Sequence, residues 1–281
     1  MESPKIAQKI AQTIDHIPPM PQVAARVFEI MANPEASCED LTEVISRDPA
    51  LASKILGLSN SPYYKRVDSI ESLGMAIMVL GFGTIHSLVM TISIGMLLGH
   101  SITRRALRKI WEHSVATALL SELLGKQIGL RDREKYYIAG LIHDVGKLVL
   151  CKLFPEKFQR TLDRFETDTI PSFEAEKEEF GFDHTQLGTA VLQKWGLPEA
   201  LHKAVAHHHH PDRFDEDEIM TPIVHIADKM AHEILEPETA ARCLTDPVVM
   251  ARLQLNEEDI ANIASQSKEM ILENLTIMAR I

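Results

Sequence analysis

Apolar residues recur at helical spacing along most of this 281-residue chain, in short stretches separated by polar or proline-containing breaks. Val23, Val27, Ile30 and Met31, for example, fall on one side of a helix predicted over residues 22–31. No stretch combines period-two alternation, β-branched enrichment and turn dipeptides, the pattern typical of strands. The sequence therefore predicts an all-α fold.

Prolines, glycines and capping residues mark where the predicted helices begin and end. In the first hundred residues we expect a stack of short helices at 4–15, 22–31, around 41–45, from 49 to about 59, at 72–80 and at 84–98. Beyond residue 100 we expect helices at 103–127, 136–150, 172–180, 184–195, from 198 towards 210, from 221 onwards, at 247–253 and at 257–278.

The composition and charge of the chain argue against several classes of protein. Hydrophobic residues make up 45% and charged residues 25%, and the net charge of −11 argues against a broad nucleic-acid-binding surface. The most apolar stretch, 84–98, is too short to span a bilayer and contains His86, so we expect a buried helix and no membrane contact. We find no signal-peptide pattern. Three widely spaced cysteines (Cys38, Cys151 and Cys243) indicate a reducing compartment, so we expect a cytoplasmic location.

A histidine followed directly by an aspartate, His143-Asp144, lies inside the apolar helical run 136–150. Such side chains are rarely buried without partners. Gly140 and Gly146 flank His143 on one helical face, at a cost of about 1 kcal/mol each relative to alanine, which suggests that something approaches the backbone there. One interpretation is a buried pair bonded to a neighbouring helix; the other is a functional site.

Two more ligand-type residues, His113 and Asp228, also lie within apolar helical segments. With His143 and Asp144 they make two histidines and two carboxylates, a set suited to a divalent transition metal such as iron, manganese or zinc. The absence of cysteine from this set argues against a structural zinc site. We expect these four side chains to converge on one point.

A second ion would need further ligands, which His184 and His208 or His209 provide at predicted helix ends. Two ions bridged by an aspartate would activate a water molecule and clamp a phosphate. Asp144 and Lys147 are the candidate catalytic residues, with the Lys147 ammonium stabilising charge on the phosphoryl group. Alternatively, these later histidines only bind phosphate or cap helix carbonyls.

The remaining polar features are interpreted as structural. Among the thirteen histidines, His16, His202 and His232 are expected at the surface, and His225 is expected in the core. The charged run 174–179 is interpreted as the solvated face of a helix.

The order His, His-Asp, Asp, with His143-Asp-Val-Gly-Lys147 at its centre, resembles the HD superfamily of metal-dependent phosphohydrolases. Further segments resemble its HDOD family, the HD-related output domain: Ile17-Pro-Pro-Met-Pro-Gln-Val-Ala24, Asp48-Pro-Ala-Leu51, Asn60-Ser-Pro62, Ala76-Ile-Met-Val-Leu-Gly81, Asp183-His-Thr-Gln-Leu-Gly188 and Trp195-Gly-Leu-Pro198. The resemblance covers residues 14–235. It implies an N-terminal helical subdomain (1–100) packed on an HD-type helical bundle (101–236), with C-terminal helices (237–281) packed on this module.

The resemblance also has implications for the function. HDOD proteins are usually regulatory output modules, often with degenerate metal ligands, whereas this sequence keeps the HD positions. It is similar to HD-GYP phosphodiesterases in having His184 and His208, which implies that Asp144 bridges two ions, but Pro211-Asp-Arg-Phe-Asp215 replaces their Gly-Tyr-Pro segment. This replacement argues against cyclic-dinucleotide hydrolysis.

Three hypotheses follow. The first is a signalling output module whose metal is structural or sensory and which acts on a signalling protein partner. The second is an active phosphohydrolase or phosphodiesterase for a nucleotide or another phosphate ester. The third is a metal-free protein-interaction domain in which the polar groups bond only to each other.

Overall fold

Every regular element in the described part of the chain is an α-helix, which confirms the predicted fold class. This computed structural model describes residues 4–61, 64, 67, 69–98, 105–168, 170–210, 213, 218–237 and 246–278. The predicted boundary between residues 100 and 101 lies outside these ranges, as does Cys243.

Short helices fill the N-terminal third, as the sequence predicts. They are α1 (Pro4–Asp15), α2 (Gln22–Met31), α3 (Cys38–Ser46), α4 (Pro49–Ser59), α5 (Leu73–Leu80) and α6 (Phe82–Leu98). Side-chain caps fix the starts of α4 and α5: the Asp48 carboxylate accepts from the backbone N–H groups of Ala50 and Leu51, and Ser72 accepts from Met75 N–H.

The remaining helices include one that the sequence analysis missed. They are α7 (Arg105–Gln127), α8 (Glu134–Ile142), α9 (Val145–Leu153), α10 (Pro155–Asp168), α11 (Ser172–Phe180), α12 (His184–Lys194), α13 (Glu199–His207), α14 (Met220–Leu235), α15 (Pro247–Arg252) and α16 (Glu257–Met278). The missed helix is α10, whose polar composition hides a narrow inward stripe that includes buried Phe158 and half-buried Leu162.

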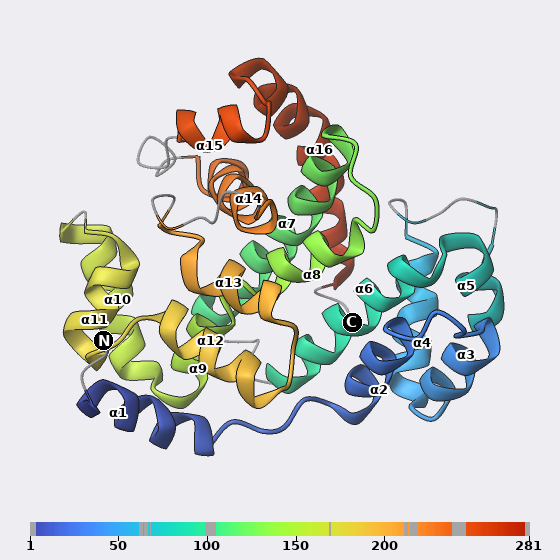
Figure 1. Ribbon diagram of the computed structural model, residues 1–281, viewed down its shortest axis with the longest axis horizontal. Coiled ribbons are helices and arrows are strands. Elements are labelled where there is room, and N and C mark those ends of the chain that lie inside the picture. Colours follow the sequence, from blue (N-terminus) through green and yellow to red (C-terminus); the bar gives the residue numbers. More distant parts are fainter. Residues whose placement is uncertain are drawn as a thin grey trace.

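The helices form two groups joined through α6. Helices α2 to α5 gather on one side of the molecule, while α7, α8 and α14 occupy its middle (Figure 1). Helix α6 packs on α2, α4 and α5 and also on α8. Helices α15 and α16 pack on α14, and α16 also packs on α7.

Helix α1 packs against α12, which is far from it in the sequence (Figure 1). Lys194 Nζ donates to the carbonyls of Ile14 and Ile17, each at 2.8 Å, and the Trp195 indole N–H donates to Pro18 O at 3.2 Å. These bonds fasten the segment after α1 to the C-terminal end of α12.

The prediction of one continuous helix over 136–150 is wrong. Helix α8 ends at Ile142 and α9 begins at Val145, with Asp144 at φ −101° and ψ 18° between them. Adjacent residues of a continuous helix point about 100° apart. The break at residues 143–144 allows both side chains to face one centre.

The glycines that flank this break mark close helix packing, as the sequence suggested. A Cβ atom on Gly140 would lie 2.7 Å from Thr117 O of α7, and one on Gly146 would lie 2.0 Å from His184 O of α12. The groups that approach the backbone are therefore neighbouring helices, and Gly146 fixes how closely α9 approaches the start of α12.

The apolar stretch predicted as a buried helix is α6. Its side chains Ile85, Leu88 and Met90 are fully buried, and Thr91 Oγ1 lies 2.9 Å from Tyr137 OH of α8. Within the described residues, no helix has both the length and the hydropathy required to cross a membrane.

We expect Gly146→Ala to lower the free energy of unfolding by about 1–3 kcal/mol, because the added methyl group overlaps backbone of α12. The matched control is Gly57→Ala in the interior of α4, where nothing lies within 4 Å of the added atom. That change should stabilise the protein by about 0.5–1 kcal/mol. Denaturant unfolding measures both, and equal stability of Gly146→Ala and the unmodified protein would contradict the packing argument.

Candidate metal centre

His113 on α7, His143 after α8 and Asp228 on α14 form a buried group in the middle of the molecule. The His113 Nε2–H donates to Asp228 Oδ1 at 2.8 Å, and His143 Nε2 lies 3.6 Å from the same oxygen. Each residue offers one ligand atom within 4.8 Å of the others. We call this group triad A.

A second group lies beside triad A and contains Asp144, His184, His208 and His209. His184 is the first residue of α12, while His208 and His209 follow α13. His184 Nε2 lies 3.1 Å from His209 Nε2 and 3.3 Å from Asp144 Oδ1. We call this group cluster B.

Asp144 lies between the two groups. Its Oδ2 atom is 3.4 Å from His143 Nε2 and 4.0 Å from His113 Nε2, while its Oδ1 atom is 3.7 Å from His208 Nε2. The seven residues proposed from the sequence as metal ligands thus come together in space. Their role as ligands stays a prediction.

Hydrogen bonds fix which ring nitrogen of three histidines faces this centre. His143 Nδ1–H donates to Gly140 O at 2.7 Å, and His208 Nδ1–H donates to Val205 O at 3.0 Å. His184 Nδ1–H donates to a carboxylate oxygen of Glu176 at 2.6 Å. In each ring, Nε2 is therefore the nitrogen available to bind a metal. Metal-binding histidines are commonly oriented in this way, by a hydrogen bond from the other ring nitrogen.

Several buried atoms that face the centre have no hydrogen-bond partner: Asp144 Oδ1, His143 Nε2 and His208 Nε2. A buried polar atom without a partner costs about 1–3 kcal/mol. Imidazole nitrogens and carboxylate oxygens are the donor atoms that divalent transition metals take in proteins. These atoms therefore fit a cation.

The electrostatics also favour a cation. Burial by itself raises the pKa of the Asp144 carboxyl, but the nearby Lys147 ammonium and His143 ring lower that pKa well below its usual value. Burial lowers the pKa of His143, yet Asp144 and Asp228 outweigh burial and raise it to about 10. Burial raises the pKa of the Asp228 carboxyl, but the hydrogen bond from His113 helps to lower it well below its usual value, so both buried carboxylates carry negative charge that attracts a cation.

Lys147 supplies part of that charge. Its Nζ donates to Asp144 Oδ2 at 2.8 Å from the first turn of α9, and its side chain is almost fully buried. The sequence placed Lys147 on the His143 side of one continuous helix. In the structure Lys147 does face the same centre as His143, although the helix is not continuous and α9 starts anew after Asp144.

One residue beside the centre, Glu176, was assigned wrongly from the sequence. Glu176, expected on a solvated face, is 1% exposed and accepts from His184. Phe173 and Phe180, three residues before and four after it, share its helical face and were a usable signal. His232, expected at the surface, keeps 28% of its side chain exposed but lies 3.7 Å from Asp228 Oδ1, four residues earlier on α14.

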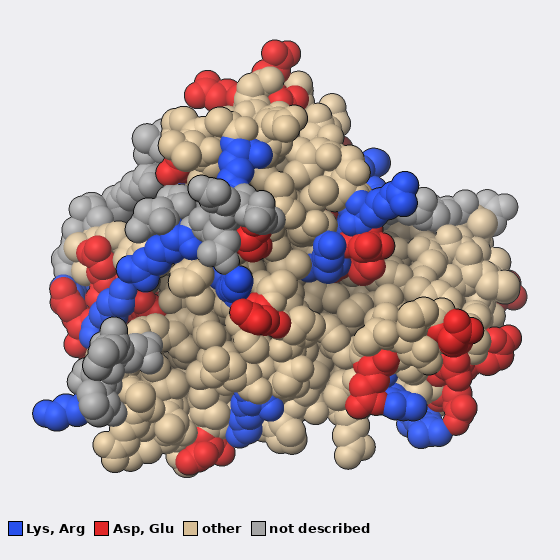
Figure 2. Space-filling model, in the orientation of Figure 1, with Lys and Arg blue, Asp and Glu red and all other residues tan. Residues whose placement is uncertain are grey.

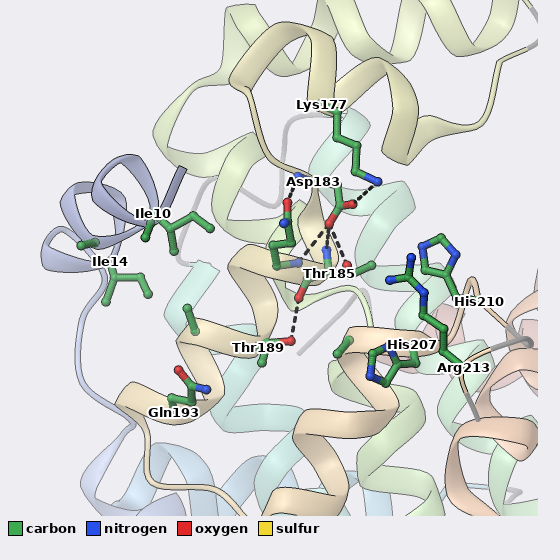
Figure 3. Close-up of a pocket in the computed structure, with 15 residues that line it drawn as sticks. Ile10, Ile14, Lys177, Asp183, Thr185, Thr189, Gln193, His207, His210 and Arg213 are labelled. Atoms are coloured by element: carbon green, nitrogen blue, oxygen red, sulfur yellow. Dashed lines mark hydrogen bonds and ion pairs between the residues drawn. The ribbon is translucent and has the colours of Figure 1, made fainter. Parts of the chain in front are cut away.

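A separate cavity of about 560 Å³ lies between α1, α12 and α13 (Figure 3). Ile10 and Ile14 line one side of it, and His207 lies on the other. On α12 it is lined by Thr185 and Thr189, which lie away from the helical face of His184. None of the predicted site residues lines this cavity.

We expect a divalent metal to stabilise the folded protein, because it binds the assembled ligands and not the unfolded chain. At 100 times its Kd the gain is about 2.7 kcal/mol, which raises Tm by about 5–10 °C for a protein of this size. Calorimetry of chelator-treated protein with and without added Mn²⁺ measures the shift.

His143→Ala should remove most of this shift. His16→Ala, at an exposed position, should retain it. An equal shift in both variants would show that the metal binds elsewhere.

The comparisons with known proteins agree with this architecture. The model of the HDOD domain matches residues 17–211. An uncharacterized protein of Treponema pallidum is 26% identical over 212 residues, or 74% of this chain; the chain spans only 40% of that relative's length.

Two solved structures share the fold. The HDOD domain protein from Geobacter sulfurreducens has a TM-score of 0.79 and 21% identity, with 97% of this chain and 95% of that chain covered. A Shewanella amazonensis protein named "Putative metal-dependent phosphohydrolase" has a TM-score of 0.67 and 20% identity, with 96% and 98% covered. Because the family model matches more than half of its residues, the chain belongs to the HDOD domain family.

Proposed function

We propose that the chain is an HDOD output module that has kept a two-ion transition-metal centre able to hydrolyse a phosphate ester. One observation carries this proposal: Asp144 points one carboxylate oxygen at triad A and the other at cluster B. A carboxylate in that position suits a bridge between two cations. Iron, manganese and zinc all accept this donor set.

In this proposal each group of residues has its own role. His113, His143 and Asp228 would hold one ion, while His184, His208 and His209 would hold the other. When bound, two such ions lower the pKa of water and polarise a phosphoryl oxygen. Lys147 keeps Asp144 ionised and oriented, and its ammonium adds positive charge beside the phosphoryl group.

The surface supports a small phosphate ester as substrate rather than a nucleic-acid polymer. On the face shown in Figure 2, Lys and Arg side chains are scattered among Asp and Glu. With a net charge of −11, the protein lacks the overall positive charge that favours phosphate polymers. The sequence Pro211-Asp-Arg-Phe-Asp215 in place of Gly-Tyr-Pro argues against cyclic dinucleotides.

Burial of the ligands favours a second candidate function, a sensory or structural metal in a module that signals to a protein partner. His143, His184 and His208 have no exposed surface, and in His209 only 17% of the side chain is exposed. Such a site limits substrate access. The partnerless buried atoms weigh against the third hypothesis, a metal-free interaction domain, because they would remain unsatisfied.

The test is a screen of the purified protein, loaded with Mn²⁺ or Fe²⁺, against p-nitrophenyl phosphate, bis(p-nitrophenyl) phosphate and common nucleotides. Turnover that a chelator abolishes supports the phosphohydrolase. Two bound ions without turnover would favour the sensory function, and absence of metal binding would overturn both.

Where turnover is found, Lys147→Gln should lower kcat by about 10²–10³-fold while the protein still binds metal, because the substitution removes a charge but no ligand. Lys152→Gln, at an exposed position on the same helix, is the matched control and should keep full activity. Unchanged kcat in Lys147→Gln would remove Lys147 from the catalytic residues.

A further inference from the structure

Helix α11 contacts two ligands of cluster B through Phe173 and Glu176, and it contacts the residue that caps α12 through Lys177. We infer that α11 is a brace dedicated to the second ion position and controls whether the centre holds one ion or two. This inference rests on the proposed function and concerns the regulation of that same site.

Glu176 is the main contact of the brace. One of its carboxylate oxygens accepts from both the backbone N–H and the ring Nδ1–H of His184, at 2.7 and 2.6 Å. A carboxylate at Nδ1 fixes the orientation of the ring and makes Nε2 more basic. Because Glu176 holds both the backbone and the ring of His184, the first residue of α12, it acts as a positioning residue for this ligand.

Phe173 and Lys177 act on the neighbours of that histidine. The Phe173 ring stacks on His209, with centroids 5.3 Å apart and planes at 26°. Lys177 Nζ lies 3.0 Å from Asp183 Oδ2, and Asp183 caps the start of α12. One side of α11 therefore orients two ligands of cluster B and the helix end that carries His184.

Among the described contacts, triad A has none directly from α11; its link to that helix runs through His209, which lies 3.9 Å from Asp228. The contacts described for His113, His143 and Asp228 come from one another, from Asp144, from other histidines of the centre and from residues of α7 and α8. These residues are held by α7, α8 and α14, which pack against each other in the middle of the molecule. Displacement of α11 would therefore disturb one ion position and spare the other.

Two other residues of α11, Glu178 and Glu179, reach the molecular surface, where a partner can bind. Glu178 and Glu179 form ion pairs with Arg164 and Arg160 of α10, and all four side chains are partly exposed. Helices α10 and α11 pack together at one edge of the molecule (Figure 1). A partner that draws this pair away from α12 would withdraw Glu176 from His184 and release the second ion.

The test uses Glu176→Gln in the full chain, with Glu174→Gln as the matched control because Glu174 is exposed two residues away on the same helix. Mn²⁺ titration by calorimetry measures both affinities, and electron paramagnetic resonance separates an exchange-coupled pair from a single ion. We expect Glu176→Gln to bind the second ion about 10- to 100-fold more weakly, leave the first unchanged, and replace the coupled signal by an isolated one. Glu174→Gln should match the unmodified protein.

Phe173→Ala provides an independent variant if Glu176→Gln fails to fold, and it should weaken the same ion through loss of the stacked His209. Unmodified protein that binds no Mn²⁺ would overturn the proposed function itself. If the unmodified protein binds two ions and the variants either keep both affinities or lose both ions equally, the inference about α11 is wrong while the proposed function stands.

Discussion

The structure depends on how it compensates a buried negative charge at Asp144. An ionised carboxylate in a protein core is costly unless positive charge and hydrogen-bond donors surround it. Here Lys147 binds one oxygen, while the other faces His184 and His208 and has no hydrogen bond. The break between α8 and α9 and the close approach at Gly146 both serve to bring these groups around Asp144.

This constraint explains why the centre draws on so many elements. A single helix can present two ligands to one point, at positions three or four residues apart. The seven candidate ligands instead come from α7, α12 and α14, from the turn between α8 and α9, and from the end of α13. The ligand geometry is therefore a property of tertiary packing, which links any change in the arrangement of the helices to the affinity for the ions.

The sequence was sufficient to predict the all-α class and four of the candidate ligands, His113, His143, Asp144 and Asp228, because a histidine or aspartate within an apolar helical stretch is visible as an exception. The other three, His184, His208 and His209, were proposed from predicted helix ends and from the family resemblance. It could not predict the break at His143-Asp144, since apolar residues continue on both sides and neither proline nor a run of polar residues marks it. Glu176 was hidden by charged neighbours that do face solvent. Its partner, His184, lies eight residues later on the next helix, and the two side chains meet only when α11 and α12 pack.

The docking of α1 on α12 bears on how the chain folds. The bond from Lys194 to Ile14 O joins residues 180 positions apart, so α1 is synthesised long before the helix on which it docks. During synthesis the apolar side of α1, with Ile10 and Ile14, has no surface to bury until α12 emerges. Contacts of such long sequence separation form slowly and leave apolar surface open to aggregation in the meantime. The docking of α1 on α12 is thus expected late in folding, after α12 has formed.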